Sequence, residues 1–195
     1  MRVFYAIDFD GHTKELLNES LTEIKNYIVR GSFTEKNNFH MTLLFVGECE
    51  TNKLADLKKV IDDTVLKLNL SPVKAVMENL GTFARPGDEL LWAGVRTEPD
   101  NTILNKISGV IFDGLNKFNI KINGSNNKFK PHITLARRVE FNKNLNGDIV
   151  KQIKFTPINF TVNSITLMES VQEIKTYGDK LYTRIIYKPL YERNF

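Results

Sequence analysis

Cysteine is nearly absent from this chain, in which Cys49 is the only one among 195 residues. One cysteine cannot form an internal disulfide, and it cannot supply the set of thiolates that a structural zinc site needs. Such a composition fits a reducing compartment. Cys49 lies in a predicted loop after Gly47, with no histidine in an obvious partner position, so we do not expect it to act as a nucleophile.

Long apolar runs are also missing. No stretch of about 18 apolar residues occurs, so the sequence predicts no membrane-spanning helix. The apolar run at the N-terminus stops at Asp8 and is too short for a secretory signal. We therefore expect a cytoplasmic protein with no membrane partner.

The chain lacks a strong excess of charge of either sign. Its formal net charge is +4, which permits long-range steering of a phosphate-bearing ligand. A dedicated duplex-binding protein usually carries a denser basic stripe. The length of 195 residues and the hydrophobic fraction of 42% suit one domain or two tightly fused lobes. We expect a monomer.

Periodic patterns predict a mixture of helices and strands. Apolar residues recur every three or four positions in residues 12–29, 53–68 and 100–118, which indicates amphipathic helices. A short helix is predicted over residues 145–153. Runs rich in β-branched and aromatic residues predict strands over residues 2–8, 38–46, 71–83, 90–96, 132–138, 158–163, 164–170 and 181–190.

Two parts of the chain repeat one order of elements, namely a strand, a helix and a strand that carries a histidine. The first part spans residues 2–46 and carries His40, and the second spans residues 90–138 and carries His132. Helices mixed with strands that mostly lack βαβ crossovers favour an α+β fold with antiparallel sheets. We predict a single bilobal domain over residues 1–195, with two sheets related by a pseudo-two-fold axis and flanked by helices.

Each of these histidines is followed two residues later by a threonine, as His40–Thr42 and His132–Thr134. Residues two apart on a strand point to the same face, about 7 Å apart at their Cα atoms. If the two strands are symmetry mates, two imidazoles and two hydroxyls converge on one groove.

This set of groups suits the cleavage of a phosphodiester. One imidazole can activate the nucleophile and the other can protonate the leaving oxygen, because the pKa of histidine lies near neutral pH. Threonine hydroxyls can donate to the phosphate oxygens. Two histidines without a nearby Asp, Glu or Cys are too few for zinc, so no metal ion or other cofactor is expected. One such motif alone is weak evidence, and the weight comes from its recurrence in both repeats.

The paired motifs resemble a known family. Residues 40–47 (HMTLLFVG) and 129–137 (FKPHITLAR), supported by residues 91–95 and 167–170, are similar to the 2H phosphoesterases, and among them to the LigT-like (ThpR) RNA 2′,3′-cyclic phosphodiesterases. The resemblance implies a bilobal α+β fold with a central groove. It also implies hydrolysis of RNA 2′,3′-cyclic phosphate ends to 2′-phosphomonoesters, with reversible 2′,5′ RNA joining in some members.

The resemblance implies a role for each motif residue. His40 corresponds to the proton donor for the departing 3′ oxygen, and His132 to the base that activates water. Thr42 and Thr134 correspond to residues that hold the phosphate. The symmetry of the sequence itself cannot distinguish the acid from the base.

Phe45 and Arg137 each lie five residues after a motif histidine. The resemblance implies that they flank the terminal nucleobase, Phe45 by stacking and Arg137 through its guanidinium group. Strict alternation along a strand would turn both to the face opposite the histidines. Either the strands end or bulge at this point, or the correspondence is wrong and Phe45 packs in the core.

Two other functions stay open. One is a phosphodiesterase of the same fold that acts on small cyclic nucleotides or on 2′,5′-linked oligonucleotides. The other is a protein that binds RNA ends without catalysis, although a binder has no need of two imidazoles in matching positions.

Overall fold

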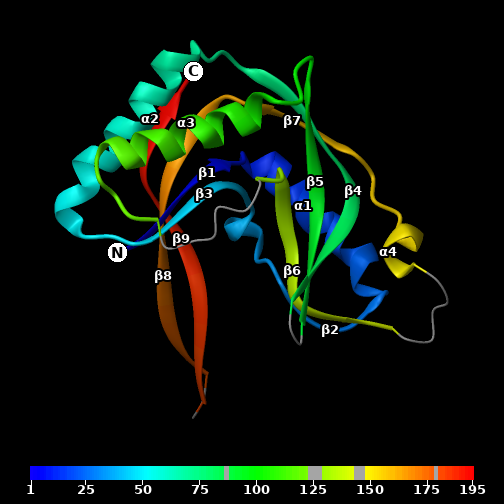
Figure 1. The fold of residues 1–195 in the computed structure, drawn as a ribbon. Coiled ribbons are helices and arrows are strands. Elements are labelled where there is room, and N and C mark those ends of the chain that lie inside the picture. Colours follow the sequence, from blue (N-terminus) through cyan, green and yellow to red (C-terminus); the bar gives the residue numbers. More distant parts are fainter. Residues whose placement is uncertain (86–87, 123–128, 143–147, 178–179) are drawn as a thin grey trace.

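A computed structural model describes the chain except for residues 86–87, 123–128, 143–147 and 178–179 (Figure 1). Its helices are α1 (Gly11–Lys25), α2 (Leu54–Leu68), α3 (Ile103–Lys117) and the short α4 (Ile149–Gln152). Its strands are β1 (Arg2–Asp8), β2 (Ile28–Phe33), β3 (His40–Glu48), β4 (Val73–Arg85), β5 (Asp88–Glu98), β6 (His132–Phe141), β7 (Ile158–Val162), β8 (Ser164–Tyr177) and β9 (Lys180–Asn194).

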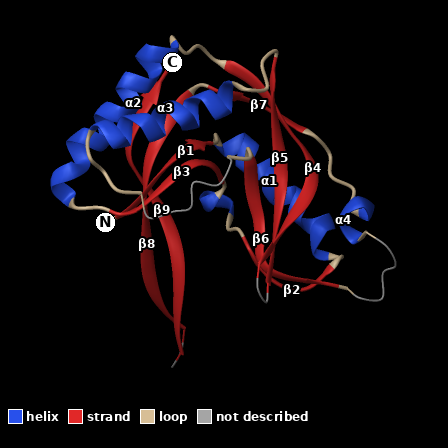
Figure 2. Ribbon diagram, in the orientation of Figure 1, coloured by secondary structure: helices blue, strands red, loops and turns tan. Residues whose placement is uncertain are grey.

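The strands form two sheets with the helices on their faces (Figure 2). One sheet has the order β3-β1-β8-β9 and the other β2-β6-β5-β4-β7. Neighbouring strands pair antiparallel throughout both sheets. The predicted α+β class with two antiparallel sheets is therefore confirmed.

The two histidine strands occupy equivalent places in their sheets. β3 pairs with β1, which lies next to β8, and β6 pairs with β5, which lies next to β4. His40 faces Asp8 on the paired strand, and His132 faces Gly94 in the same way. The strand order thus repeats between the sheets, as a pseudo-two-fold relation requires, and β2 is added at the edge beyond β6.

The helices exchange sheets between the two repeats. α1 follows β1 in the chain but packs against β2 and β7 of the other sheet, whereas α3 follows β5 but packs against β3 and α2 (Figure 1). The apolar stripe of each helix is buried against these elements, and it includes Leu17 in α1 and Ile111 in α3. Each repeat therefore covers the sheet of the other. None of the described helices is long and apolar enough to cross a bilayer.

Several element boundaries differ from the predicted ones. The helix predicted over residues 12–29 ends at Lys25, and Ile28–Phe33 forms β2, which pairs with β6. The pairing partner lies about a hundred residues away along the chain, and local periodicity does not report such a contact. The predicted helix over residues 145–153 is reduced to α4, and its residues 145–147 lie outside the described part of the chain.

Gly81 allows an aromatic side chain to lie flat on the β4 backbone. It pairs with Trp92 on β5, and a Cβ atom at position 81 would lie only 2.3 Å from Cζ2 of the indole. The Trp92 ring in turn lies 5.3 Å from the Phe83 ring and 6.3 Å from the His132 ring, measured between centroids. This close approach places an aromatic wall beside one of the motif histidines.

We expect Gly81→Ala to destabilise the protein by about 1–3 kcal/mol, because the added methyl group overlaps a rigid buried ring. The free energy of unfolding from urea titration measures this loss. Gly11→Ala is the control, since an added Cβ there has no atom within 4 Å. Equal stability of Gly81→Ala and the unmodified chain would contradict this packing.

Candidate active site

His40 lies at the start of β3, between two aromatic rings. The Phe4 ring is 4.9 Å away and the Tyr187 ring 4.7 Å away, measured between centroids. Its Nδ1–H donates to the Asn38 carbonyl at 2.7 Å, because a carbonyl oxygen can only accept. This bond leaves Nε2 with its lone pair toward the Thr42 hydroxyl, 3.0 Å away. One backbone contact thus sets both the orientation and the tautomer of the ring.

His132 is held in the same way at the start of β6. Its Nδ1–H donates to the Lys130 carbonyl at 2.7 Å, again from the residue two positions earlier. The edge of its ring meets Phe83 at 5.0 Å between centroids. The two motif histidines therefore share a tautomer and a local geometry, and both are half-buried.

The surroundings of His40 strongly disfavour its charged form. Burial lowers the pKa of the imidazole to about 4, and the positive charges of Arg137 and Lys14 act in the same direction. The bond to the Asn38 carbonyl and the carboxylate of Asp8 oppose this effect without overcoming it. His40 is consequently neutral at neutral pH.

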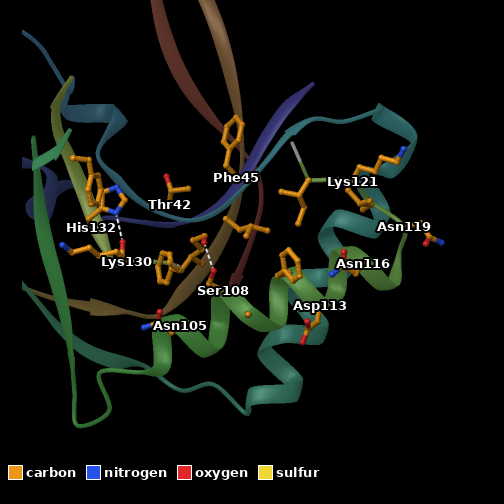
Figure 3. A pocket seen from close by; sticks show the side chains of 18 of the residues that line it. Thr42, Phe45, Asn105, Ser108, Asp113, Asn116, Asn119, Lys121, Lys130 and His132 are labelled. Atoms are coloured by element: carbon orange, nitrogen blue, oxygen red, sulfur yellow. Dashed lines mark hydrogen bonds between the residues drawn. The ribbon is translucent and has the colours of Figure 1, made fainter. Parts of the chain in front are cut away.

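The structure brings the two motifs together from opposite sheets. β3 and β6 lie side by side where the two lobes meet. Thr42 and His132 line one cavity of about 1460 Å³, and Figure 3 shows both at the same end of it. Thr134 lies two residues after His132 on β6 and is half-buried like Thr42. Of the two imidazoles and two hydroxyls predicted to converge on one groove, His132 and Thr42 line this cavity, whereas His40 and Thr134 are not among its lining residues.

A β-bulge follows the threonine in β3. Ala6 pairs with Thr42 and Tyr5 pairs with Leu44, so Leu43 is an extra residue without its own partner on β1. One extra residue reverses the alternation of side chains along the strand.

The same irregularity occurs in β6. Trp92 pairs with Thr134 and Leu91 pairs with Ala136, which leaves Leu135 as the extra residue. The two strands therefore bulge at matching positions of their motifs.

Because of the bulges, Phe45 and Arg137 lie on the same strand face as the histidines. With strict alternation they would lie on the opposite face. Phe45 is half-buried, its ring 6.4 Å from that of Phe4, with the guanidinium carbon of Arg2 5.0 Å from its centroid. Arg137 is exposed, and its charge acts on His40. The bulges are the physical reason that each residue shares a strand face with its motif histidine, and Phe45 also lines the cavity.

Each bulge is secured by a contact from the other repeat. The buried Ser108 hydroxyl in α3 donates to the Leu43 carbonyl at 2.9 Å. The backbone N–H of Thr34, just after β2, donates to the Leu135 carbonyl at 2.9 Å. The extra residues thus keep their hydrogen bonds although the ladder is interrupted.

A family model described as the AKAP7 2′5′ RNA ligase-like domain matches residues 12–182. The chain belongs to this family. An Archaeoglobus fulgidus protein named RNA 2′,3′-cyclic phosphodiesterase is 30% identical over 184 residues, 93% of this chain and 96% of the relative. A Thermotoga maritima protein of the same name is 25% identical, with 100% and 96% covered. The resemblance to 2H phosphoesterases is thereby confirmed.

Solved structures have the same fold as this AKAP7 2′5′ RNA ligase-like domain. TT0787 of Thermus thermophilus matches with a TM-score of 0.71 at 23% identity, over 100% of this chain and 97% of that one. E. coli LigT complexed with 3′-AMP matches with a TM-score of 0.71 at 22% identity, over 99% and 97%. The predicted bilobal arrangement is therefore a known one.

Several residues around the candidate active site are not predicted from the sequence. Tyr187 comes from β9, far along the chain from the motifs, yet it forms one wall of the His40 pocket. The side chain of Asn38 binds the same strand, where it donates to the Ile185 carbonyl at 2.7 Å. In the sequence pattern, Ser108 is only one more position of an amphipathic helix. No local pattern marks these three residues, because their roles depend on contacts between elements.

The described part of the chain contains no group of three or more His, Cys, Asp or Glu side chains placed to bind a metal ion.

We expect the ring protons of His40 to titrate with a midpoint near 4, measured by NMR without added substrate. Tyr187→Ala should raise this pKa toward 6.5, because it opens the pocket to water and burial is the largest cause of the shift. Asp8→Asn should lower it further, since it removes the carboxylate that favours the charged ring. Shifts of the same sign in both variants would contradict this explanation.

Proposed function

We propose that this chain hydrolyses RNA ends bearing a 2′,3′-cyclic phosphate to 2′-phosphomonoesters, with His40 and His132 as a metal-independent acid–base pair. The observation that carries the proposal is the matched pair of imidazoles, each fixed by the same backbone contact, on neighbouring strands of two sheets. The shared name of the relatives from A. fulgidus and T. maritima supports this substrate.

His132 is the base in this proposal. With its Nδ1–H bonded to the Lys130 carbonyl, the neutral ring presents Nε2 to the cavity. Nε2 takes a proton from water, and the water oxygen forms a bond to phosphorus on the side opposite the 3′ oxygen. The bond between phosphorus and the 3′ oxygen then breaks, while the 2′ oxygen keeps the phosphate.

His40 is the acid that donates the proton from Nε2 to the departing 3′ oxygen. This role requires an imidazolium, although burial by itself keeps the ring neutral by lowering its pKa. A bound phosphate anion raises that pKa, because a negative charge nearby stabilises the protonated ring. Protonation of His40 is therefore coupled to substrate binding. Proton donation leaves His40 neutral, and after product release His132 gives its proton to solvent, so both rings are again neutral.

The remaining motif residues hold the substrate. The hydroxyls of Thr42 and Thr134 donate to the non-bridging phosphate oxygens, where negative charge grows during the reaction. Phe45 stacks on the terminal base and Arg137 contacts the base or its phosphate through the guanidinium group. If a 5′-hydroxyl replaces water in the same step, the product is a 2′,5′ linkage, in keeping with the ligase-like description of the family.

Replacing either motif histidine with alanine should lower the rate about 10²–10⁴-fold, because each removes one proton transfer. His12→Ala is the matched control, since this third histidine is exposed in α1. The measurement is turnover of an RNA that ends in a 2′,3′-cyclic phosphate, in the presence of a chelator, with identification of the phosphorylated oxygen. Loss of activity in chelator, or a 3′-phosphate product, would exclude the proposed reaction.

Arg137→Ala should lower kcat/KM about tenfold through a higher KM, since it removes a cation from the substrate face. Arg138→Ala removes the same charge from the next residue, whose guanidinium donates to the Ser32 hydroxyl instead, and should change KM little. Steady-state kinetics of both variants tests the difference. Equal losses would mean that only the general positive charge of this segment matters.

A further inference from the structure

The cavity continues well beyond the catalytic end. Its volume of about 1460 Å³ exceeds the roughly 300–1,000 Å³ of an ordinary small-molecule site. Thr42, Lys130 and His132 line one end, and from there the cavity runs between β3 and α3 to residues 119–122 (Figure 3). Most of this space is therefore not needed for a cyclic phosphate and its own base.

One face of α3 forms the floor of this extension. Asn105, Gly109, Phe112 and Asn116 are spaced by four, three and four residues, so they share one side of the helix, and all four line the cavity. We name these four residues the α3 stripe. Gly109 leaves open space above the helix, since an added Cβ there has no atom within 4 Å.

The chemistry of the α3 stripe suits nucleotides. Its two exposed amides can both donate and accept hydrogen bonds, as the edges of bases do. The half-buried ring of Phe112 offers a surface on which a base can stack. Figure 3 shows a lysine near each end of the cavity, Lys130 beside His132 and Lys121 beyond α3. The carboxylate of Asp113 also lines the cavity, so a ligand with more than one phosphate would be held by its ends, at these two lysines.

We propose that the groove between β3 and the α3 stripe binds the RNA nucleotides that precede the cyclic phosphate end. The inference rests on the proposed function, because an RNA end held at His132 is attached to a strand that must leave the site. The groove is continuous with that end. Phe112 stacks on a preceding base, the amides of Asn105 and Asn116 contact base or sugar edges, and Lys121 contacts a backbone phosphate.

Filling the groove at Gly109 tests this inference without touching the catalytic end. Gly109→Leu extends a side chain into the open space, whereas Gly109→Ala adds only a methyl group; both residues favour a helix more than glycine does, so folding is preserved. For an RNA octamer with a 2′,3′-cyclic phosphate, Gly109→Leu should lower kcat/KM by about tenfold, the loss of roughly one stacked base. Gly109→Ala should stay within about twofold. Cyclic mononucleotides should be turned over equally by all three proteins.

Binding of an unreactive octamer that ends in a 2′-phosphate, measured by fluorescence anisotropy, provides a readout that does not depend on turnover. Gly109→Leu should weaken it by the same factor. The inference is overturned if Gly109→Leu leaves octamer binding unchanged, or if it lowers the turnover of octamer and mononucleotide alike. Absence of turnover by the unmodified chain would reject the proposed function instead, and octamer binding would still decide on the groove.

Discussion

One extra residue in each histidine strand determines which side chains face the groove. Without Leu43 and Leu135 outside the ladder, the residue five positions after each histidine would point away from that face, and Leu44 or Ala136 would lie on it instead. The bulges add an aromatic ring on one side and a guanidinium on the other. A symmetric pair of strands thereby carries an asymmetric set of side chains.

These bulges depend on the exchange of helices between the repeats. The Leu43 carbonyl is bound by Ser108 of the second repeat, and the Leu135 carbonyl by Thr34 of the first. An unpaired backbone carbonyl in a buried setting would be costly, so each repeat stabilises the irregular backbone of the other. This reciprocity explains why the two lobes form one groove of defined shape although their sheets share no strand.

Local sequence patterns predicted the elements whose structure depends mainly on the residues within them. The buried apolar face of α3 is of this kind, and so is the spacing of His40–Thr42 and His132–Thr134. In each case the helix or strand period fixes which residues share a face. The first two residues of β2 were assigned to the end of α1 and the rest of the strand was not predicted, since its identity comes from pairing with β6. The bulges were raised only as one of two explanations for Phe45 and Arg137. Tyr187 and Ser108 were not foreseen, because only the folded arrangement brings them to the site.

The local geometry of the two histidines is the same, so any difference in their roles has to come from what surrounds them. His40 lies between Phe4 and Tyr187, in a pocket that lowers the pKa of the ring. In the proposed reaction, a bound phosphate anion raises the pKa of this ring, which takes its proton from solvent, and burial then favours transfer of that proton to the departing oxygen. The pocket that opposes protonation of His40 is therefore compatible with the acid role that we propose for it.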